Sequence, residues 1–235
     1  MNINSNKHFL IWFLLPFFAI NVSAQGEIYC KEYEGDCQKT KAFFTKHKNE
    51  LENAAKTCGL TAEFLFAVVA PELTQYSYLS NKLETYSLKV LYVQGDKSYS
   101  NFSIGYFQMK PSFVELLEEI AVKDTNLKIK YATCLFDNPD ERAARVTRID
   151  RLNTVEWQIT YLSLFCEIVQ KRFSNLVFAT AEEQLRFYSS AYNCGFHKSE
   201  QQIKETEQKA LFPHFSRQKF KYSDIAVWFY KAILG

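Results

Sequence analysis

The sequence contains few residues that break regular structure and no marked excess of positive charge. Its 235 residues include seven glycines, five prolines and two methionines. None of them gathers into a linker or a low-complexity tract, so no internal domain boundary is indicated. Lysine and arginine number 28, against 26 aspartate and glutamate residues. This balance disfavours nucleic acid as a partner, because phosphate binding needs a concentrated basic surface.

No apolar run is long enough to cross a bilayer. The run from Phe9 to Ile20 covers about a dozen residues, whereas a spanning helix needs about 20. A lysine precedes it and small residues ending at Ala24 follow it, which is typical of a secretory signal peptide; a membrane anchor is the alternative. We therefore expect residues 1–24 to be a signal peptide. Residues 25–235 would then form one exported domain, periplasmic or secreted, with no membrane span.

Six cysteines follow the predicted signal peptide. An even number in an exported chain suggests disulfides, and Cys30 with Cys37 is the favoured local pair. Disulfides and buried free thiols both remain open for the other four. A catalytic thiol at Cys194 beside His197 is a weaker alternative, because closeness in sequence does not place a base near a thiol. A metal site that uses the first two cysteines lacks paired CxxC spacing, so we predict no metal and no cofactor.

Helical periodicity dominates the chain, and strand patterns are few. Thr61 has the position of a helix N-cap before the apolar stretch 64–70, and Pro111 suits the first turn of a helix. Thr180 and the glutamate three residues later have the spacing of a capping box. Residues 88–94, LKVLYVQ, fit a strand or a helix equally well. The pattern predicts a mostly α fold.

The stretch FAVVAPELTQY, residues 66–76, places an acid beside an apolar helix. The helix is apolar all round as far as Ala70, and Pro71 should kink or end it. Glu72 follows directly. Burial beside such a helix would raise the pKa of the carboxyl, so that it stays protonated near neutral pH and can act as a general acid. An ordinary surface glutamate at a helix end is the alternative.

Three separated stretches, GLTAEFLFAVVAPEL, SIGYFQMKPSF and SSAYNCGF, occur in this order between residues 59 and 196. Together they resemble the lytic transglycosylase (SLT-type) family, lysozyme-like enzymes that cut the glycan strands of peptidoglycan. The first stretch resembles the family's helix that carries the catalytic glutamate. The second resembles its Gly-Leu-Met-Gln segment and the third its Ala-Tyr-Asn-Ala-Gly segment.

The resemblance implies a fold and a set of site residues. It predicts a lysozyme-like α-helical domain in which Glu72 is the catalytic residue. The backbone at Gly105 would pass close to the saccharide, and Gln108 would lie beside the cleavage site. Tyr192 and Asn193 would form the facing wall of the groove. A simple turn, a core tyrosine and a helix end are the ordinary alternatives for the glycine, the tyrosine and the asparagine.

The chain also departs from the pattern of the family. The interval between the acid and the second motif is longer than in common members and predicts an inserted tyrosine-rich segment. We expect Tyr99 and Tyr106, which flank the second motif, to contact the ligand. Leu73 stands where the family usually has a serine that holds the catalytic carboxyl, and Thr74 or Gln75 is the available substitute.

The family works with a single glutamate, which protonates the glycosidic oxygen and then acts as base while the sugar's own 6-hydroxyl attacks. The expected partner is therefore the peptidoglycan glycan strand, cut at the MurNAc-GlcNAc β-1,4 bond with formation of 1,6-anhydro-MurNAc ends; partners in an envelope complex are not identified. Glu84, Asp96, Glu115 and Asp124 have no spacing that marks a second catalytic carboxylate. Two alternatives remain open. One is a non-catalytic lysozyme-like protein that binds glycan or acts as a scaffold, which Leu73 favours, and the other is a hydrolytic lysozyme (muramidase).

Overall fold

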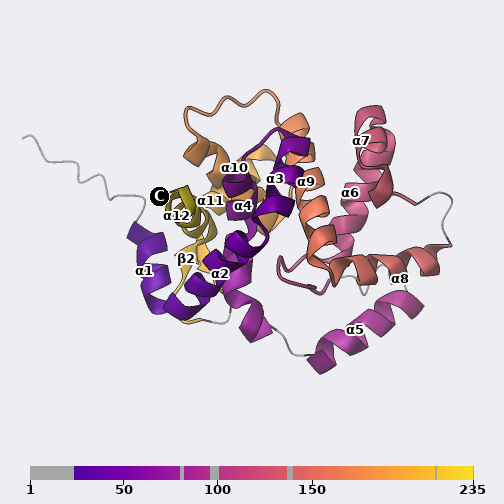
Figure 1. Ribbon diagram of the computed structural model, residues 1–235, viewed down its shortest axis with the longest axis horizontal. Helices are drawn as coiled ribbons and strands as arrows, with labels where there is room; N and C mark the ends of the chain where they lie inside the picture. Colours follow the sequence, from indigo (N-terminus) through magenta and orange to yellow (C-terminus); the bar gives the residue numbers. More distant parts are fainter. Residues whose placement is uncertain (1–23, 80–81, 96–100, 137–139, 215, 235) are drawn as a thin grey trace, which may run out of the picture.

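The fold is mostly α-helical, as the sequence predicts (Figure 1). A computed structural model describes residues 24–79, 82–95, 101–136, 140–214 and 216–234. The predicted signal peptide, apart from its last residue, and Tyr99 lie outside these ranges. In chain order the elements are α1 (Ala24–Glu32), α2 (Glu34–Lys46), α3 (Lys48–Cys58), α4 (Ala62–Leu79), α5 (Lys82–Gln94), α6 (Pro111–Lys123), α7 (Thr125–Lys130), the 3₁₀ helix η2 (Ala132–Cys134), α8 (Glu141–Leu152), α9 (Val155–Arg172), α10 (Ala181–Cys194), α11 (Glu200–Glu207), β1 (Ala210–Phe212), β2 (Phe220–Lys221) and α12 (Tyr222–Leu234).

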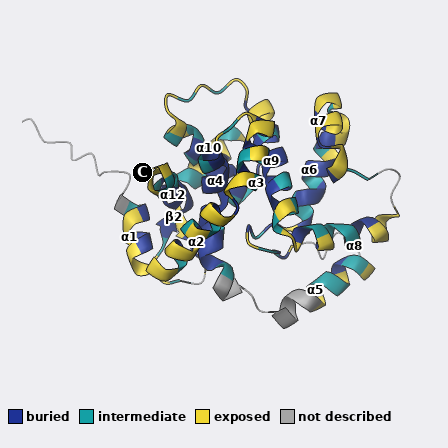
Figure 2. Cartoon of the chain, in the orientation of Figure 1, coloured by how far each residue is buried: buried dark blue, intermediate teal, exposed yellow. Residues whose placement is uncertain are grey.

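Helix α4 forms the centre of the core. Its residues 64–70 are buried because α2, α3, α10 and α12 all pack against it (Figure 2). Thr61 caps its start, since the Thr61 hydroxyl accepts a hydrogen bond from a backbone N–H of the first turn at 3.2 Å. The helix does not end at Pro71 but continues to Leu79. Neighbouring helices hold it across the proline, and Glu72 therefore lies inside a helix rather than at its end.

The other helices form two groups that meet at α9. In Figure 1, α5 to α8 lie on one side of α9, and α1 to α4 with α10 to α12 lie on the other. Helix α9 is buried along most of its length and packs against α3 as well as against α6 and α8. Residues 88–94, which the sequence left open, belong to helix α5. Pro111 opens α6 as predicted, and Thr180 caps α10 as predicted.

The two short strands and a disulfide fasten the ends of the chain to the core. β1 and β2 pair antiparallel just before α12, and α12 packs against α4, α10 and α1. Cys30 and Cys37 form a disulfide between α1 and α2, which confirms the favoured local pair. The other four cysteines are free thiols, and all but Cys194 are buried.

No single helix within the described ranges is long and apolar enough to cross a membrane. The bent pair Lys48–Cys58 and Ala62–Tyr76 reaches that length and composition only when its two helices are taken together.

Candidate active site

A cleft of about 670 Å³ lies among elements that are far apart in the sequence. Its walls come from α4, the loop at residues 101–110, the start of α6, the end of α10 and the segment after β1. Gly105 and Tyr106 belong to the same loop but are not among the residues that line the cleft. Four of the predicted site residues line it: Glu72, Gln108, Tyr192 and Asn193.

The carboxyl of Glu72 lies at the wall of this cleft in surroundings that disfavour its charged form. Glu72 retains partial solvent exposure, yet burial of its carboxyl raises the pKa from 4.5 to about 7. A hydrogen bond with Tyr222 and the positive charge of Lys110 both act in the opposite direction. The acid is therefore neutral over much of the pH range below 7, and its ionised form has two groups beside it that favour negative charge.

Tyr222, the first residue of α12, places its hydroxyl beside the Glu72 carboxyl. The ring is buried, and its hydroxyl donates to the carbonyl oxygen of Val68 at 3.3 Å as well as lying in hydrogen-bonding contact with Glu72. Tyr222 is not predictable from the sequence, because nothing in its local sequence distinguishes it from the other aromatic residues of α12.

Neither substitute that the sequence offered for the missing serine holds the acid. Thr74 Oγ1 contacts the Tyr29 hydroxyl at 2.5 Å and donates to the Pro71 carbonyl at 2.6 Å. Gln75 lines the cleft, but its Nε2 donates to the same Tyr29 hydroxyl at 2.8 Å. These hydrogen bonds join α4 to Tyr29 of α1. The two side chains therefore hold α1 in place rather than the Glu72 carboxyl.

The loop that contains the second motif is a tight hairpin whose two ends pair with each other. Ile104 and Met109 form an antiparallel bridge. Between these two residues, the backbone N–H and the backbone carbonyl of Phe107 are both hydrogen-bonded. Its N–H donates to Gln158 Oε1 at 2.7 Å, and its carbonyl accepts from the Tyr192 hydroxyl at 2.6 Å. Because Phe107 is completely buried, these two bonds satisfy backbone groups that water does not reach.

Gly105 is required at its position by packing against α9. Its φ of +72° lies in the left-handed region, and a Cβ added there would lie 1.7 Å from Gln158 Nε2. That amide also donates to the Leu152 carbonyl at 2.7 Å, so it is not free to move aside. Gln158 is not predictable from the sequence either, because it is a single residue in a helix distant from the motif.

Gln108 also has a positive φ, +50°, and its side chain returns to its own turn, where Nε2 donates to the Gly105 carbonyl at 2.7 Å. Gln108 also lines the cleft. A non-glycine residue in this region of φ costs of order 1–3 kcal/mol and persists where surrounding structure requires it. The hairpin therefore fixes the direction in which the Gln108 amide is presented.

Glu72 is the one acidic residue among the described residues that line the cleft, whereas Lys110, His197 and His214 are basic. Of the four other carboxylates considered from the sequence, the side chains of Glu84 and Asp96 are not described. Asp124 caps α7 and binds Lys171 at 2.7 Å.

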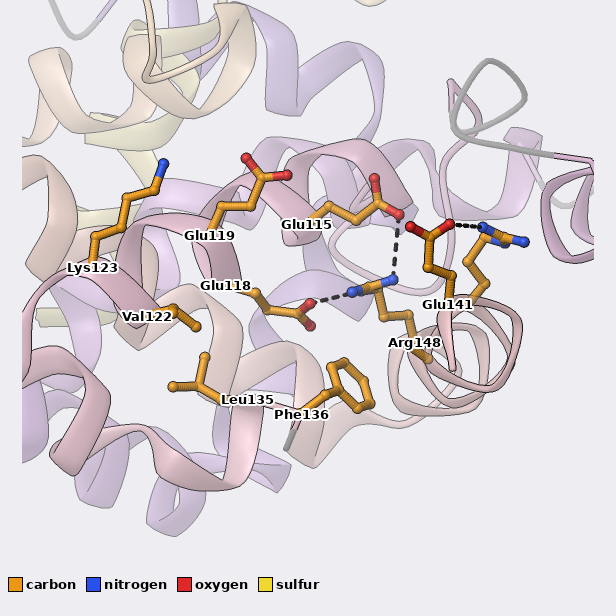
Figure 3. Close-up of a pocket in the computed structure, with 11 residues that line it drawn as sticks. Glu115, Glu118, Glu119, Val122, Lys123, Leu135, Phe136, Glu141 and Arg148 are labelled. Carbon is orange, nitrogen blue, oxygen red and sulfur yellow. Dashed lines mark hydrogen bonds and ion pairs between the residues drawn. The ribbon is translucent and has the colours of Figure 1, made fainter. Parts of the chain in front are cut away.

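Glu115, the fourth, lies in a second cleft, of about 400 Å³, between α6 and α8 (Figure 3). It accepts a hydrogen bond from the Tyr92 hydroxyl at 2.7 Å and pairs with Arg148 at 3.3 Å. The same guanidinium binds Glu118 at 2.7 Å. Both buried carboxyl groups share the single positive charge of Arg148, and the network joins α6 to α8.

No group of three or more His, Cys, Asp or Glu side chains within the described ranges is placed to hold a metal ion. Cys194 and His197 both line the cleft, but the thiol is directed at the Gly195 carbonyl at 3.9 Å.

Comparisons of the chain with protein-family models, curated proteins and solved structures find no match.

Proposed function

We propose that the protein is an exported peptidoglycan lytic transglycosylase, periplasmic or secreted, with a lysozyme-like helical fold. The observation that carries the proposal is a desolvated acid, Glu72, in a cleft whose other described lining residues include no second carboxylate. The cleft also gathers Gln108, Tyr192 and Asn193 from the two other stretches that resemble the family. A surface glutamate at a helix end would have neither of these surroundings.

In the proposed reaction, protonated Glu72 donates its proton to the oxygen that bridges N-acetylmuramic acid and N-acetylglucosamine. The bond between this oxygen and the anomeric carbon breaks, and positive charge develops on the muramic acid ring. Lys110 and Tyr222 stabilise the carboxylate that results. The carboxylate then removes the proton of the sugar's 6-hydroxyl as that oxygen attacks the anomeric carbon. Glu72 is protonated again, no water is consumed, and the product has a 1,6-anhydro ring.

Among the described residues that line the cleft, Glu72 has no second carboxylate beside it, which favours this mechanism over that of a two-acid hydrolase. Retaining and inverting glycosidases place a second carboxylate roughly 5 to 9.5 Å from the acid. Glu115 and Asp124 are bound elsewhere. A reaction that uses the substrate's own hydroxyl needs no second carboxylate.

A non-catalytic glycan-binding or scaffold protein is the second candidate, and Leu73 is the observation that favours it. The side chain is buried and offers no hydroxyl to the acid. Tyr222 supplies the missing hydroxyl from a different helix, which restores a partner for Glu72.

The test is mass spectrometry of peptidoglycan digested by residues 25–235, beside a Glu72→Gln variant. We expect muropeptides that end in 1,6-anhydro-N-acetylmuramic acid, and we expect them to be absent with the variant. Reducing-end products would instead identify a hydrolase. Binding of glycan by a folded protein that releases nothing would identify a scaffold.

A further inference from the structure

A row of aromatic side chains begins one helical turn beyond Glu72. Tyr76 follows Glu72 by four residues in α4, so both lie on the same face of that helix. The ring of Tyr76 packs against Tyr106 in a tilted arrangement with centroids 4.4 Å apart, and Tyr106 in turn packs on Phe43 of α2 at 5.0 Å. We call Phe43, Tyr76 and Tyr106 the aromatic ridge.

The aromatic ridge is open to solvent although it consists of large apolar rings. Tyr106 is 38% exposed, and the two other rings are half-buried. The large rings of this protein are mostly buried: Phe66, Phe107 and Phe165 are each fully covered. Partly exposed aromatic rings that begin one helical turn from Glu72 are typical of a binding surface rather than of a core, and none of the three lines the cleft itself.

The backbone beneath the aromatic ridge is fixed before any ligand arrives. Tyr106 lies at the tip of the hairpin whose neighbouring residue, Phe107, is bound by Gln158 and Tyr192. Gly105, on the other side of Tyr106, packs directly against the Gln158 amide. A platform held in this way loses little conformational entropy on binding.

We propose that the aromatic ridge is an additional saccharide-binding platform, which holds sugar units of the glycan strand beyond those inside the cleft. The proposal rests on the proposed function, because it takes the occupant of the cleft to be a glycan. Sugar rings have apolar C–H faces bordered by hydroxyl groups, and tyrosine offers a flat apolar face with a polar tip. The chain would leave the cleft at Glu72 and pass over Tyr76 and then Tyr106.

The experiment compares two lengths of ligand in an inactive background. Glu72→Gln protein is titrated calorimetrically with a tetrasaccharide and an octasaccharide prepared from peptidoglycan glycan strands. We expect the octasaccharide to bind more tightly, and we expect a further Tyr76→Ala, Tyr106→Ala pair of changes to weaken its binding by roughly three- to tenfold, the effect of losing an aromatic contact. Binding of the tetrasaccharide should change little.

Two controls separate binding from folding. Tyr106→Phe retains the ring and should retain the preference for the longer ligand. Tyr230→Ala removes a half-buried tyrosine of α12 that lies outside both the cleft lining and the aromatic ridge, so it should leave both affinities unchanged. Thermal unfolding of each variant verifies that the fold is intact.

The other outcomes overturn the inference in distinguishable ways. An octasaccharide preference that survives loss of both tyrosines removes the role of the aromatic ridge and leaves the proposed function standing. Failure of Glu72→Gln protein to bind either length removes both. If sedimentation instead shows a dimer that the Tyr76→Ala, Tyr106→Ala protein cannot form, the aromatic ridge is a surface for self-association.

Discussion

Replacing Glu72 with glutamine should stabilise the folded protein at neutral and alkaline pH, although we expect the same change to abolish cleavage. Burial raises the pKa of the Glu72 carboxyl to about 7 in the folded protein, above its ordinary value of 4.5. Between these two values the folded state retains a proton that the unfolded state has released. The free energy of unfolding therefore falls as pH rises through this interval.

The size of the effect follows from the width of the interval. At about 1.4 kcal/mol per pH unit, ionisation of a fully desolvated carboxyl with these pKa values would cost the folded protein about 3 kcal/mol by pH 8. Glu72 is partly exposed to solvent, which reduces this value, and we expect a cost of about 1 to 3 kcal/mol. Glutamine has nearly the same shape and never ionises, so the variant avoids the cost.

Urea unfolding of both proteins at several pH values from 4 to 8 measures this difference directly. Relative to the parent, the Glu72→Gln protein should gain stability steadily between about pH 4.5 and 7, and the gain should then level off. Glu205→Gln is the matched control, because it removes an exposed carboxyl of α11, and it should follow the parent throughout. A difference between Glu72→Gln and the parent that does not vary with pH would refute the desolvation of Glu72.

Two further changes test the surroundings of the acid. Gly105→Ala should destabilise the protein by about 1 to 3 kcal/mol in urea unfolding, because a methyl group at φ +72° would collide with Gln158; stability equal to the parent would contradict the close packing. Lys110→Met should move the alkaline limb of the activity–pH profile upward, since the lysine's positive charge lowers the pKa of Glu72. A downward move would mean that the lysine does not face the acid.

Local sequence signals predicted the helices because each signal acts within one turn. Thr61 and Thr180 cap helices with their own hydroxyls, and Pro111 opens α6. Pro71 was predicted to kink or end its helix, and the helix does not end there. A proline costs a helix about 3 kcal/mol, and the packing of four neighbouring helices against α4 offsets this cost. Residues 88–94 stayed ambiguous because an apolar run of that length has no decisive period.

Only those site residues that belong to a recognisable sequence motif could be predicted. Glu72 and Gln108 lie in stretches with a recognisable pattern, and the structure brings both to the cleft. Tyr222 and Gln158 contact these stretches from helices distant in sequence. Nothing in their own neighbourhood distinguishes them from the many aromatic and polar residues that only pack. Such partners are decided by tertiary contact, which periodicity and spacing do not encode.

The hydrogen bonds of Tyr222 give a physical reason why one acid can serve in both halves of the proposed reaction. A phenolic hydroxyl has a single hydrogen to donate. In the structure that hydrogen is directed to the Val68 carbonyl, an arrangement that leaves the phenolic oxygen able to accept from the protonated acid. Once the acid has given its proton to the leaving oxygen, the same hydroxyl can rotate and donate to the carboxylate. The rotation stabilises the anion for the time between the two proton transfers and is reversed when Glu72 takes the proton of the attacking hydroxyl.

An acid held by a serine on its own helix would have a donor fixed by local backbone geometry. Here the donor is supplied by α12, so the packing of α12 on α4 places the group that favours the ionised acid, against the larger effect of burial, which favours the protonated acid.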